Sequence, residues 1–215
     1  MLDRQDERYR NAWEAVYAAG SNPFDVKEPL DWVTELAAQG AFGQRVLEVG
    51  CGGGHNAAYL AARGHSVVGV DVAPSAIARA RARAAARKLV AEFVVADVRD
   101  LSALAPGFDS VLDIGCFHSL DSDADRDAYA AALASVCRRG ARLHLRAASD
   151  RNAPRTVGAH AAPRVSEADL RRTFAAPTWQ LEQLASRTTT VMIRNPPEPH
   201  EFDFWYANFV VNAGD

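Results

Sequence analysis

The chain has 215 residues, of which 48% are hydrophobic and 24% are charged, and its formal net charge is −3. These values are typical of one globular domain, and the acidic balance argues against general binding to a nucleic-acid backbone. No apolar run is long enough to span a bilayer, the charged N-terminus lacks a signal peptide, and three widely spaced cysteines suggest neither a disulfide framework nor a zinc site. We therefore expect a cytoplasmic monomer or homodimer with no metal site and no nucleic-acid or membrane partner.

Two helices are expected before the first strand. The first covers residues 1–20, where Trp13 and Tyr17 lie on one aromatic stripe, and the second follows Pro29. Because both precede the repeating strand–helix pattern, they either cover one face of the sheet or close over a ligand site. In the second case, Trp13, Tyr17 and Phe24 are the residues expected to line a pocket.

The first predicted strand, residues 45–49, runs into a turn that is rich in glycine. Such a turn between a buried strand and a helix brings backbone close to a ligand. The dinucleotide fingerprint would need its third glycine at position 55, where the chain has His55, so a nicotinamide cofactor is disfavoured. The spacing present is acid-x-Gly-x-Gly-x-Gly, from Glu48 to Gly54.

The next two predicted strands, residues 65–71 and 92–98, carry acids at or near their carboxyl ends. Asp71 lies about 20 residues beyond the glycine turn, where a carboxylate can accept hydrogen bonds from both ribose hydroxyls. Asp97 occupies the corresponding place on the following strand. Open α/β sheets bind ligands at the carboxyl ends of their strands, so these acids predict a nucleotide site. We expect Asp71 to contribute little to the core, so that Asp71→Ala loses nucleotide affinity but still folds.

The second half of the chain continues the alternation and then changes. Further helices are expected at residues 124–138 and after Ser166, and further strands at residues 108–115, 142–147, 179–190 and 202–211. No helix separates the last two strands, so one of them should be antiparallel. The prediction is an α/β fold, Rossmann-like, with seven mostly parallel strands, helices on both faces, one antiparallel strand near the C-terminus and an N-terminal helical cap.

The glycine turn and the acidic strand ends resemble those of the class I S-adenosylmethionine-dependent methyltransferases, and the resemblance covers most of the chain. Within that class, residues 117–120 and the helical cap resemble the small-molecule thiopurine, thiol and tellurite methyltransferases. The resemblance implies one domain over residues 1–215, with a cap at 1–40 and a core at 41–215. It also implies S-adenosylmethionine as cofactor and in-line methyl transfer to a small molecule, a thiol or other chalcogen nucleophile in the first instance.

The resemblance assigns Asp71 to the ribose, Asp97 and the Val98 backbone to the adenine edge, and Val72 to the adenine face. The full set of implied cofactor residues is Glu48, Gly50, Cys51, Gly52, Gly54, Asn56, Asp71, Val72, Asp97, Val98, Ile114 and Gly115. The implied acceptor pocket consists of Trp13, Tyr17, Phe24, Phe117, His118 and Arg151.

His118 is the candidate catalytic residue. It would serve as the base for a hydroxyl acceptor, whereas a thiol needs little help because its thiolate is partly populated near neutral pH, and His118 would then only shape the pocket. Two other functions stay open. One is an O- or N-methyltransferase of an aromatic metabolite, and the other is a non-catalytic S-adenosylmethionine-binding sensor or partner subunit.

Overall fold

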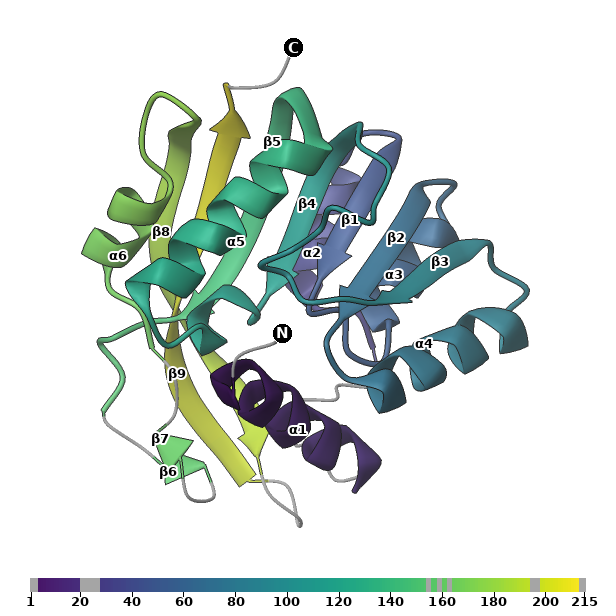
Figure 1. The fold of residues 1–215 in the computed structure, drawn as a ribbon, viewed down its shortest axis with the longest axis horizontal. Coiled ribbons are helices and arrows are strands. Elements are labelled where there is room, and N and C mark those ends of the chain that lie inside the picture. The colour runs from purple at the N-terminus through teal and green to yellow at the C-terminus, as the bar shows by residue number, and fades with distance from the viewer. Residues whose placement is uncertain are drawn as a thin grey trace. The chain divides into compact units, whose positions relative to one another are not determined.

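The computed structural model describes residues 4–19, 28–153, 156–157, 160–161, 164–193 and 198–212. The chain divides into two compact units, Met1–Val98 and Arg99–Asp215. Its large sheet has seven strands in the order β3-β2-β1-β4-β5-β9-β8, which confirms the expected Rossmann-like α/β fold class (Figure 1). That the whole chain acts as one methyltransferase domain stays a prediction.

The first unit contains three parallel strands joined by two helices. These elements are β1 (Arg45–Val49), α3 (His55–Ala61), β2 (Ser66–Asp71), α4 (Pro74–Ala86) and β3 (Ala91–Val95). Apart from the buried acids Glu48 and Asp71 and the less buried first residue of each strand, the β1–β2 pair is a buried apolar run, as expected for strands covered on both faces. The three carboxyl ends therefore lie along one edge of this unit.

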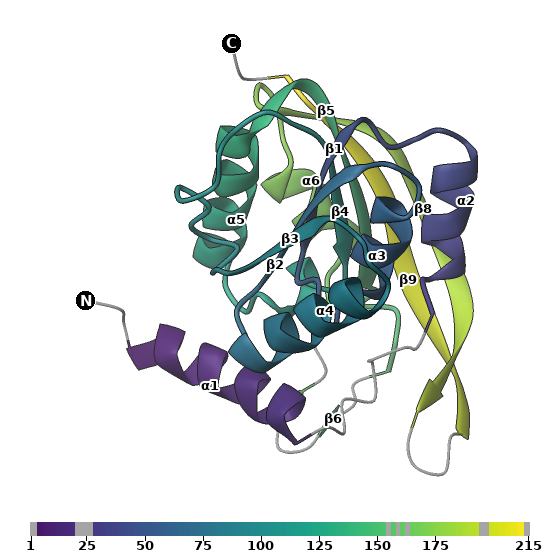
Figure 2. The same ribbon diagram turned by 90° about the vertical axis from the view of Figure 1, so that its right-hand side faces the viewer.

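The helical cap belongs to the first unit and consists of α1 (Arg4–Ala18) and α2 (Asp31–Ala38). Helix α1 lies alongside α4 (Figures 1 and 2). The Glu14 carboxylate accepts hydrogen bonds from the Ser75 hydroxyl and, at 3.0 Å, from the Ser75 backbone N–H. In the other direction, Arg79 donates to the carbonyl of Tyr17 at 2.5 Å. Polar contacts at two points thus fasten α1 to the beginning of α4.

The second unit holds the remaining four strands of the large sheet. Its elements are β4 (Phe108–Ile114), the 3-10 turn η1 (Phe117–Ser119), α5 (Asp123–Val136), β5 (Cys137–Ala148), α6 (Glu167–Thr173), β8 (Trp179–Ile193), β9 (Glu198–Val211) and a separate pair, β6 (Thr156–Val157) with β7 (His160–Ala161). Strand β5 is parallel to β4, whereas β9 is antiparallel to both of its neighbours. The single antiparallel strand expected near the C-terminus is confirmed.

The predicted end of the helix at residues 124–138 is wrong. This helix was expected to run to residue 138 and to be closed by Gly140, but α5 ends at Val136 and β5 begins at Cys137. Gly140 has a φ of 80° and lies where the register between β4 and β5 shifts. It therefore belongs to a bulge inside a strand and does not end a helix.

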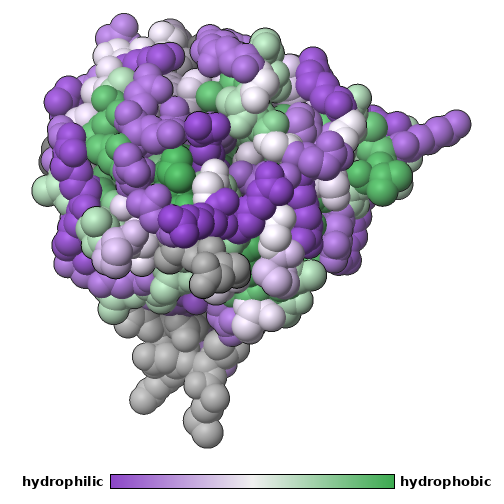
Figure 3. Space-filling view, turned by 90° about the horizontal axis from the view of Figure 1, so that it is seen from above, coloured by the Kyte–Doolittle hydropathy of each residue, from purple (hydrophilic) through white to green (hydrophobic). Residues whose placement is uncertain are grey.

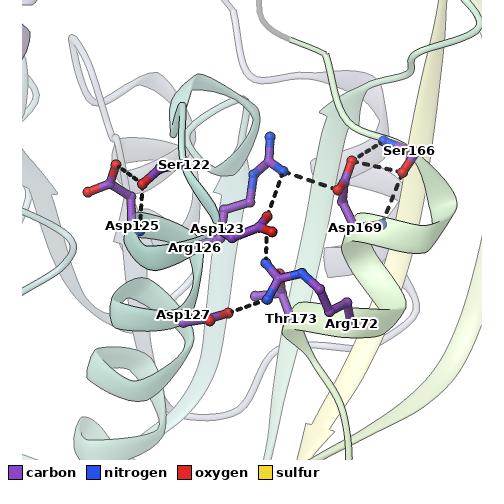
Figure 4. Close-up of polar contacts among 9 residues, drawn as sticks. All are labelled: Ser122, Asp123, Asp125, Arg126, Asp127, Ser166, Asp169, Arg172 and Thr173. Carbon is purple, nitrogen blue, oxygen red and sulfur yellow. Dashed lines mark hydrogen bonds and ion pairs between the residues drawn. The ribbon is translucent and has the colours of Figure 1, made fainter.

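Helices α5 and α6 join through an aromatic core and a set of ion pairs. Phe174 packs against Tyr129 and Phe209 with ring centroids 6.2 and 4.5 Å apart. At the surface, Arg126 pairs with Asp169 at 3.2 Å, and Arg172 contacts two acids of α5 (Figure 4). The core contacts and these pairs together hold α6 against α5.

The face seen in Figure 3 is mostly hydrophilic, and its hydrophobic side chains lie in small groups separated by polar ones. Among the described residues, no helix has the length and apolar character needed to cross a membrane.

Candidate active site

The glycine turn after β1 depends on glycine in two ways. Gly50, Gly52 and Gly54 have φ values of 59°, 51° and 72°, in the left-handed region that other residues rarely adopt. A Cβ at Gly54 would stand 2.8 Å from the Ala80 Cβ, and one at Gly52 would stand 2.5 Å from the Tyr17 hydroxyl. The backbone of the turn is therefore in close contact with both α4 and α1.

Asp71, at the end of β2, is bonded to the backbone on both sides. Its Oδ2 accepts from Gly52 N–H and its Oδ1 from Ala73 N–H, both at 2.9 Å. The side chain is 6% exposed, and burial raises its pKa although the backbone bonds favour the ionised form. Asp71 is more buried than expected for a residue with little part in the core, and it ties the glycine turn to the start of α4. That Asp71→Ala still folds stays a prediction.

The ribose role expected for Asp71 stays a prediction. An ionised carboxylate offers about four lone-pair positions. The N–H groups of Gly52 and Ala73 take one position on each oxygen, and the backbone N–H of Val72 is a further partner. A ribose bound at Asp71 would therefore share the carboxylate with these backbone donors.

Glu48 and Asn56, both expected at the cofactor, contact each other. The Asn56 amide donates to Glu48 Oε1 at 2.9 Å, and its carbonyl oxygen accepts from the backbone N–H of Leu30 at 3.1 Å. Both side chains are buried. They link the end of β1 to α3 and to the start of α2, so they help to fix the position of the glycine turn between β1 and α3.

The third acidic strand end lies next to the second. The Ala96 N–H donates to the carbonyl of Asp71 at 3.0 Å, which continues the pairing of β2 and β3 past the last residue of β3. Asp97 follows at once and is partly exposed, Val98 is buried, and Val72 is partly exposed. The structure thus brings the cofactor residues expected in this unit to one edge.

Two of the expected pocket aromatics, Tyr17 and Trp13, pack against the start of α4. Tyr17 is buried in a cluster with Ala73 and Ala76, and Trp13 packs against that cluster. Phe24 lies outside the described residues. Helix α1 therefore covers the start of α4, and Tyr17 reaches the glycine turn.

In the second unit, His118 accepts a hydrogen bond and is not poised as a base. The backbone N–H of Ala148 donates to its Nδ1 at 3.0 Å. Burial, with a contribution from the positive charge of Arg146, lowers the pKa of His118 to about 4. The neutral ring with an occupied Nδ1 carries its proton on Nε2, so this nitrogen is a hydrogen-bond donor.

The expected cofactor residue Gly115 lies against His118, and Ile114 ends β4. A Cβ at Gly115, where φ is 85°, would stand 3.1 Å from the His118 ring. Two expected pocket residues lie elsewhere. Phe117 is fully buried against Phe174, with centroids 5.3 Å apart, and exposed Arg151 stacks on Trp205 at 4.7 Å. These contacts do not support pocket roles for Phe117 and Arg151.

A buried acid beneath η1 was not predicted from the sequence. Asp113 is fully buried and accepts from the Tyr129 hydroxyl at 2.6 Å and from the N–H groups of Cys116 and Phe117 at 2.8 and 2.9 Å. Burial raises the pKa of Asp113 to about 6 despite these bonds. Asp113 and Tyr129 therefore hold the turn that carries His118.

Arg146 was also missed. It was not among the expected site residues, although its place at the carboxyl end of a parallel strand was a usable signal. Its Nε donates to the Tyr206 hydroxyl at 3.0 Å, and its guanidinium lies 3.5 Å from the centroid of the Phe204 ring. Tyr206 is accordingly the partner of a cation and more than the core residue that its position in the sequence suggests.

Comparison with known proteins decides the family. A model described as a methyltransferase domain matches residues 46–140. An uncharacterized methyltransferase of Schizosaccharomyces pombe is 37% identical over 120 residues, which are 56% of this chain and 82% of that protein. The chain belongs to the class I S-adenosylmethionine-dependent methyltransferases. The enzyme class and the cofactor expected from the glycine turn are thereby confirmed.

Other similar proteins are named for different reactions. A structure reported for the conversion of a disulfide bond into a thioacetal group during echinomycin biosynthesis is 32% identical, with a TM-score of 0.84 over 94% of this chain and 92% of that one. The 2-heptyl-1-hydroxyquinolin-4(1H)-one methyltransferase of Mycobacteroides abscessus is 33% identical over 142 residues, 66% of this chain and 62% of that protein. TehB from Haemophilus influenzae, at 15% identity and a TM-score of 0.69, shares the fold.

Proposed function

We propose that this methyltransferase transfers the methyl group of S-adenosylmethionine to a sulfur atom of a small-molecule acceptor. The observation that carries the proposal is the hydrogen bond from Ala148 N–H to His118 Nδ1, which leaves His118, the base expected from the sequence, without a nitrogen to receive a proton.

The first unit supplies the cofactor site in this proposal. Asp71 accepts from the ribose hydroxyls, Asp97 and the Val98 N–H contact the adenine edge, and the glycine turn lets the cofactor approach the backbone. The Gly52 and Ala73 N–H groups keep the Asp71 carboxylate oriented. When bound, the sulfonium supplies an electrophilic methyl group.

Sulfur suits a site without a base. A thiol near neutral pH already contains a fraction of thiolate, which is the nucleophile, and a disulfide sulfur has no proton to lose. The new carbon–sulfur bond forms as the sulfonium carbon–sulfur bond of the cofactor breaks. A thiol loses its proton to solvent, whereas a disulfide sulfur keeps the positive charge as a new sulfonium. Alignment and exclusion of water are then the main tasks of the protein. His118 contributes its Nε2–H as a donor to the acceptor.

The relative connected with the disulfide-to-thioacetal conversion supports the choice of sulfur, since its reaction is at sulfur and it resembles this chain over nearly its full length. An O-methyltransferase is the second candidate. It is favoured by the relative named for a hydroxyquinolinone, and it would require a base other than neutral His118.

Two measurements test the proposal. Calorimetric titration with S-adenosylhomocysteine, with NAD as the control, should show binding of the former alone. Formation of S-adenosylhomocysteine from S-adenosylmethionine is then measured with matched thiols, disulfides, phenols and anilines. We expect turnover with thiols or disulfides well above that with phenols and anilines. Turnover confined to phenols or anilines would rule out the sulfur acceptor.

A further inference from the structure

Arg146 differs from Arg142 and Arg126 in what surrounds its charge. Arg142, four residues earlier on the same face of β5, is exposed and forms an ion pair with Glu182 at 3.0 Å. Arg126 pairs with Asp169 at 3.2 Å. Among the described residues no carboxylate pairs with Arg146, which contacts the Tyr206 hydroxyl and the Phe204 ring.

Arg146 is also partly buried, and burial lowers its pKa although Tyr206 opposes the shift. Removing a guanidinium from water costs free energy that a phenol and an aromatic ring compensate only in part. A cation kept in such surroundings is suited to a negatively charged ligand, because the ligand supplies the missing charge.

The guanidinium is held in a defined direction. The Tyr206 hydroxyl that accepts from Arg146 lies 3.2 Å from the hydroxyl of Thr189 on β8, and the Phe204 ring covers the guanidinium. An arginine fixed by a hydrogen bond and a stacked ring loses little conformational freedom on binding a ligand.

Arg146 lies at the same end of the sheet as His118. The Gly115 N–H donates to the Arg146 carbonyl at 2.9 Å, and Ala148, two residues further along β5, donates to His118. The charge of Arg146 also acts on the His118 ring. Both side chains thus belong to the part of the second unit assigned to the acceptor.

We propose that Arg146 binds an anionic group of the methyl acceptor, either a carboxylate that the acceptor carries or the thiolate that is methylated. The inference rests on the proposed function for the existence of the acceptor site, and it names the charge that this site selects. It replaces the exposed Arg151 as the cation that recognises the acceptor.

The test compares two probes, 4-mercaptobenzoate and 4-mercaptobenzamide, which differ in one charge. The variants are Arg146→Gln, Arg146→Lys and the control Arg142→Gln, which removes an exposed cation from the same strand and face. The kcat/KM for each probe and the affinity for S-adenosylhomocysteine are measured for all of them. Binding of each probe in the presence of S-adenosylhomocysteine is measured separately, so that the result does not depend on turnover.

A carboxylate ligand predicts that Arg146→Gln lowers binding and kcat/KM of the benzoate by about tenfold or more, with the benzamide unaffected. A thiolate ligand predicts a similar loss for both probes. In either case Arg146→Lys should recover part of the loss, and Arg142→Gln should behave like the parent protein.

Equal behaviour of Arg146→Gln and the parent protein towards both probes would overturn the inference. So would a parent protein that binds neither probe, or a variant that loses S-adenosylhomocysteine affinity to the same degree. If the parent protein binds the benzoate through Arg146 but methylates no sulfur probe, the proposed sulfur acceptor fails and the anion site stands.

Discussion

The hydroxyl of Tyr17 lies over the backbone of Gly52, so close that a Cβ at position 52 would stand 2.5 Å from it. One residue comes from the helical cap and the other from the glycine turn. Because of this contact, a substitution that displaces Tyr17 or Gly52 should move both the cap and the glycine turn.

We predict that Gly52→Ala lowers the affinity for S-adenosylhomocysteine by about tenfold or more, because the new methyl group and Tyr17 compete for one position. The control is Gly40→Ala, since Gly40 has a similar φ of 68° and a Cβ there meets nothing within 4 Å. Both substitutions should cost about 1–2 kcal/mol in the free energy of unfolding. An equal loss of affinity in both variants would show that Tyr17 is not the cause.

Asp71→Asn should weaken both the cofactor site and the fold. The amide keeps one acceptor oxygen, so either Gly52 N–H or Ala73 N–H loses its carboxylate partner. We expect a loss of about 1–3 kcal/mol in the free energy of unfolding and a drop of about tenfold or more in S-adenosylhomocysteine affinity, measured by denaturation and calorimetry. The control Asp31→Asn removes an exposed acid from α2. Unchanged affinity in Asp71→Asn would remove Asp71 from the ribose site.

His118→Asn tests the roles of the two ring nitrogens separately. The Asn oxygen can replace Nδ1 as acceptor for Ala148 N–H, whereas the donor at Nε2 is lost. We expect normal S-adenosylhomocysteine affinity, a lower kcat and an unchanged midpoint in the pH dependence of kcat/KM between about pH 5.5 and 8. A midpoint that is present in the parent protein and disappears in the variant would restore His118 as a base.

Tyr129→Phe tests the buried acid. The folded-state pKa of Asp113, about 6, lies above its ordinary value of 3.8, so the stability that Asp113 contributes is fully present below that ordinary value and is lost as pH rises through 6. The Tyr129 hydrogen bond limits this loss by stabilising the ionised carboxylate. Tyr129→Phe should therefore cost about 2 kcal/mol at about pH 8 and clearly less at about pH 5, measured by urea denaturation.

The matched control for this prediction is Tyr59→Phe, because the Tyr59 hydroxyl has no hydrogen-bond partner in the part of the chain that the structure describes. Its ring packs under Arg63 at 3.4 Å. The control should change the free energy of unfolding by less than about 0.5 kcal/mol at both pH values. A cost for Tyr129→Phe that does not depend on pH would mean that Asp113 does not titrate in this range.

Local rules predicted the residues expected at the cofactor in the first unit. The glycines were predictable because positive φ is a property of single residues, and Asp71 and Asp97 were predictable because strand ends follow from hydrophobic patterning. The same rules gave a wrong helix end at Gly140, because a glycine with positive φ is compatible with both a helix end and a strand bulge.

In the second unit, the contacts of the residues missed from the sequence join partners far apart in the chain. Asp113 meets Tyr129 sixteen residues later, and Arg146 meets Tyr206 sixty residues later. Neither pair has a short motif, so the charge and burial of Asp113 and Arg146 become visible only when the strands are placed. The cytoplasmic location and the oligomeric state stay predictions.

The occupied Nδ1 of His118 also bears on which molecules the enzyme can use. A site that cannot remove a proton admits, in chemical terms, those nucleophiles that reach it already ionised or without a proton to lose. Alcohols and most phenols would then not react near neutral pH, even where their shape fits, because they are too weakly acidic to be ionised. The range of acceptors would then be set by the pKa of the group that is methylated. Candidate metabolites ranked by that pKa would be a better guide to the natural acceptor than candidates ranked by size.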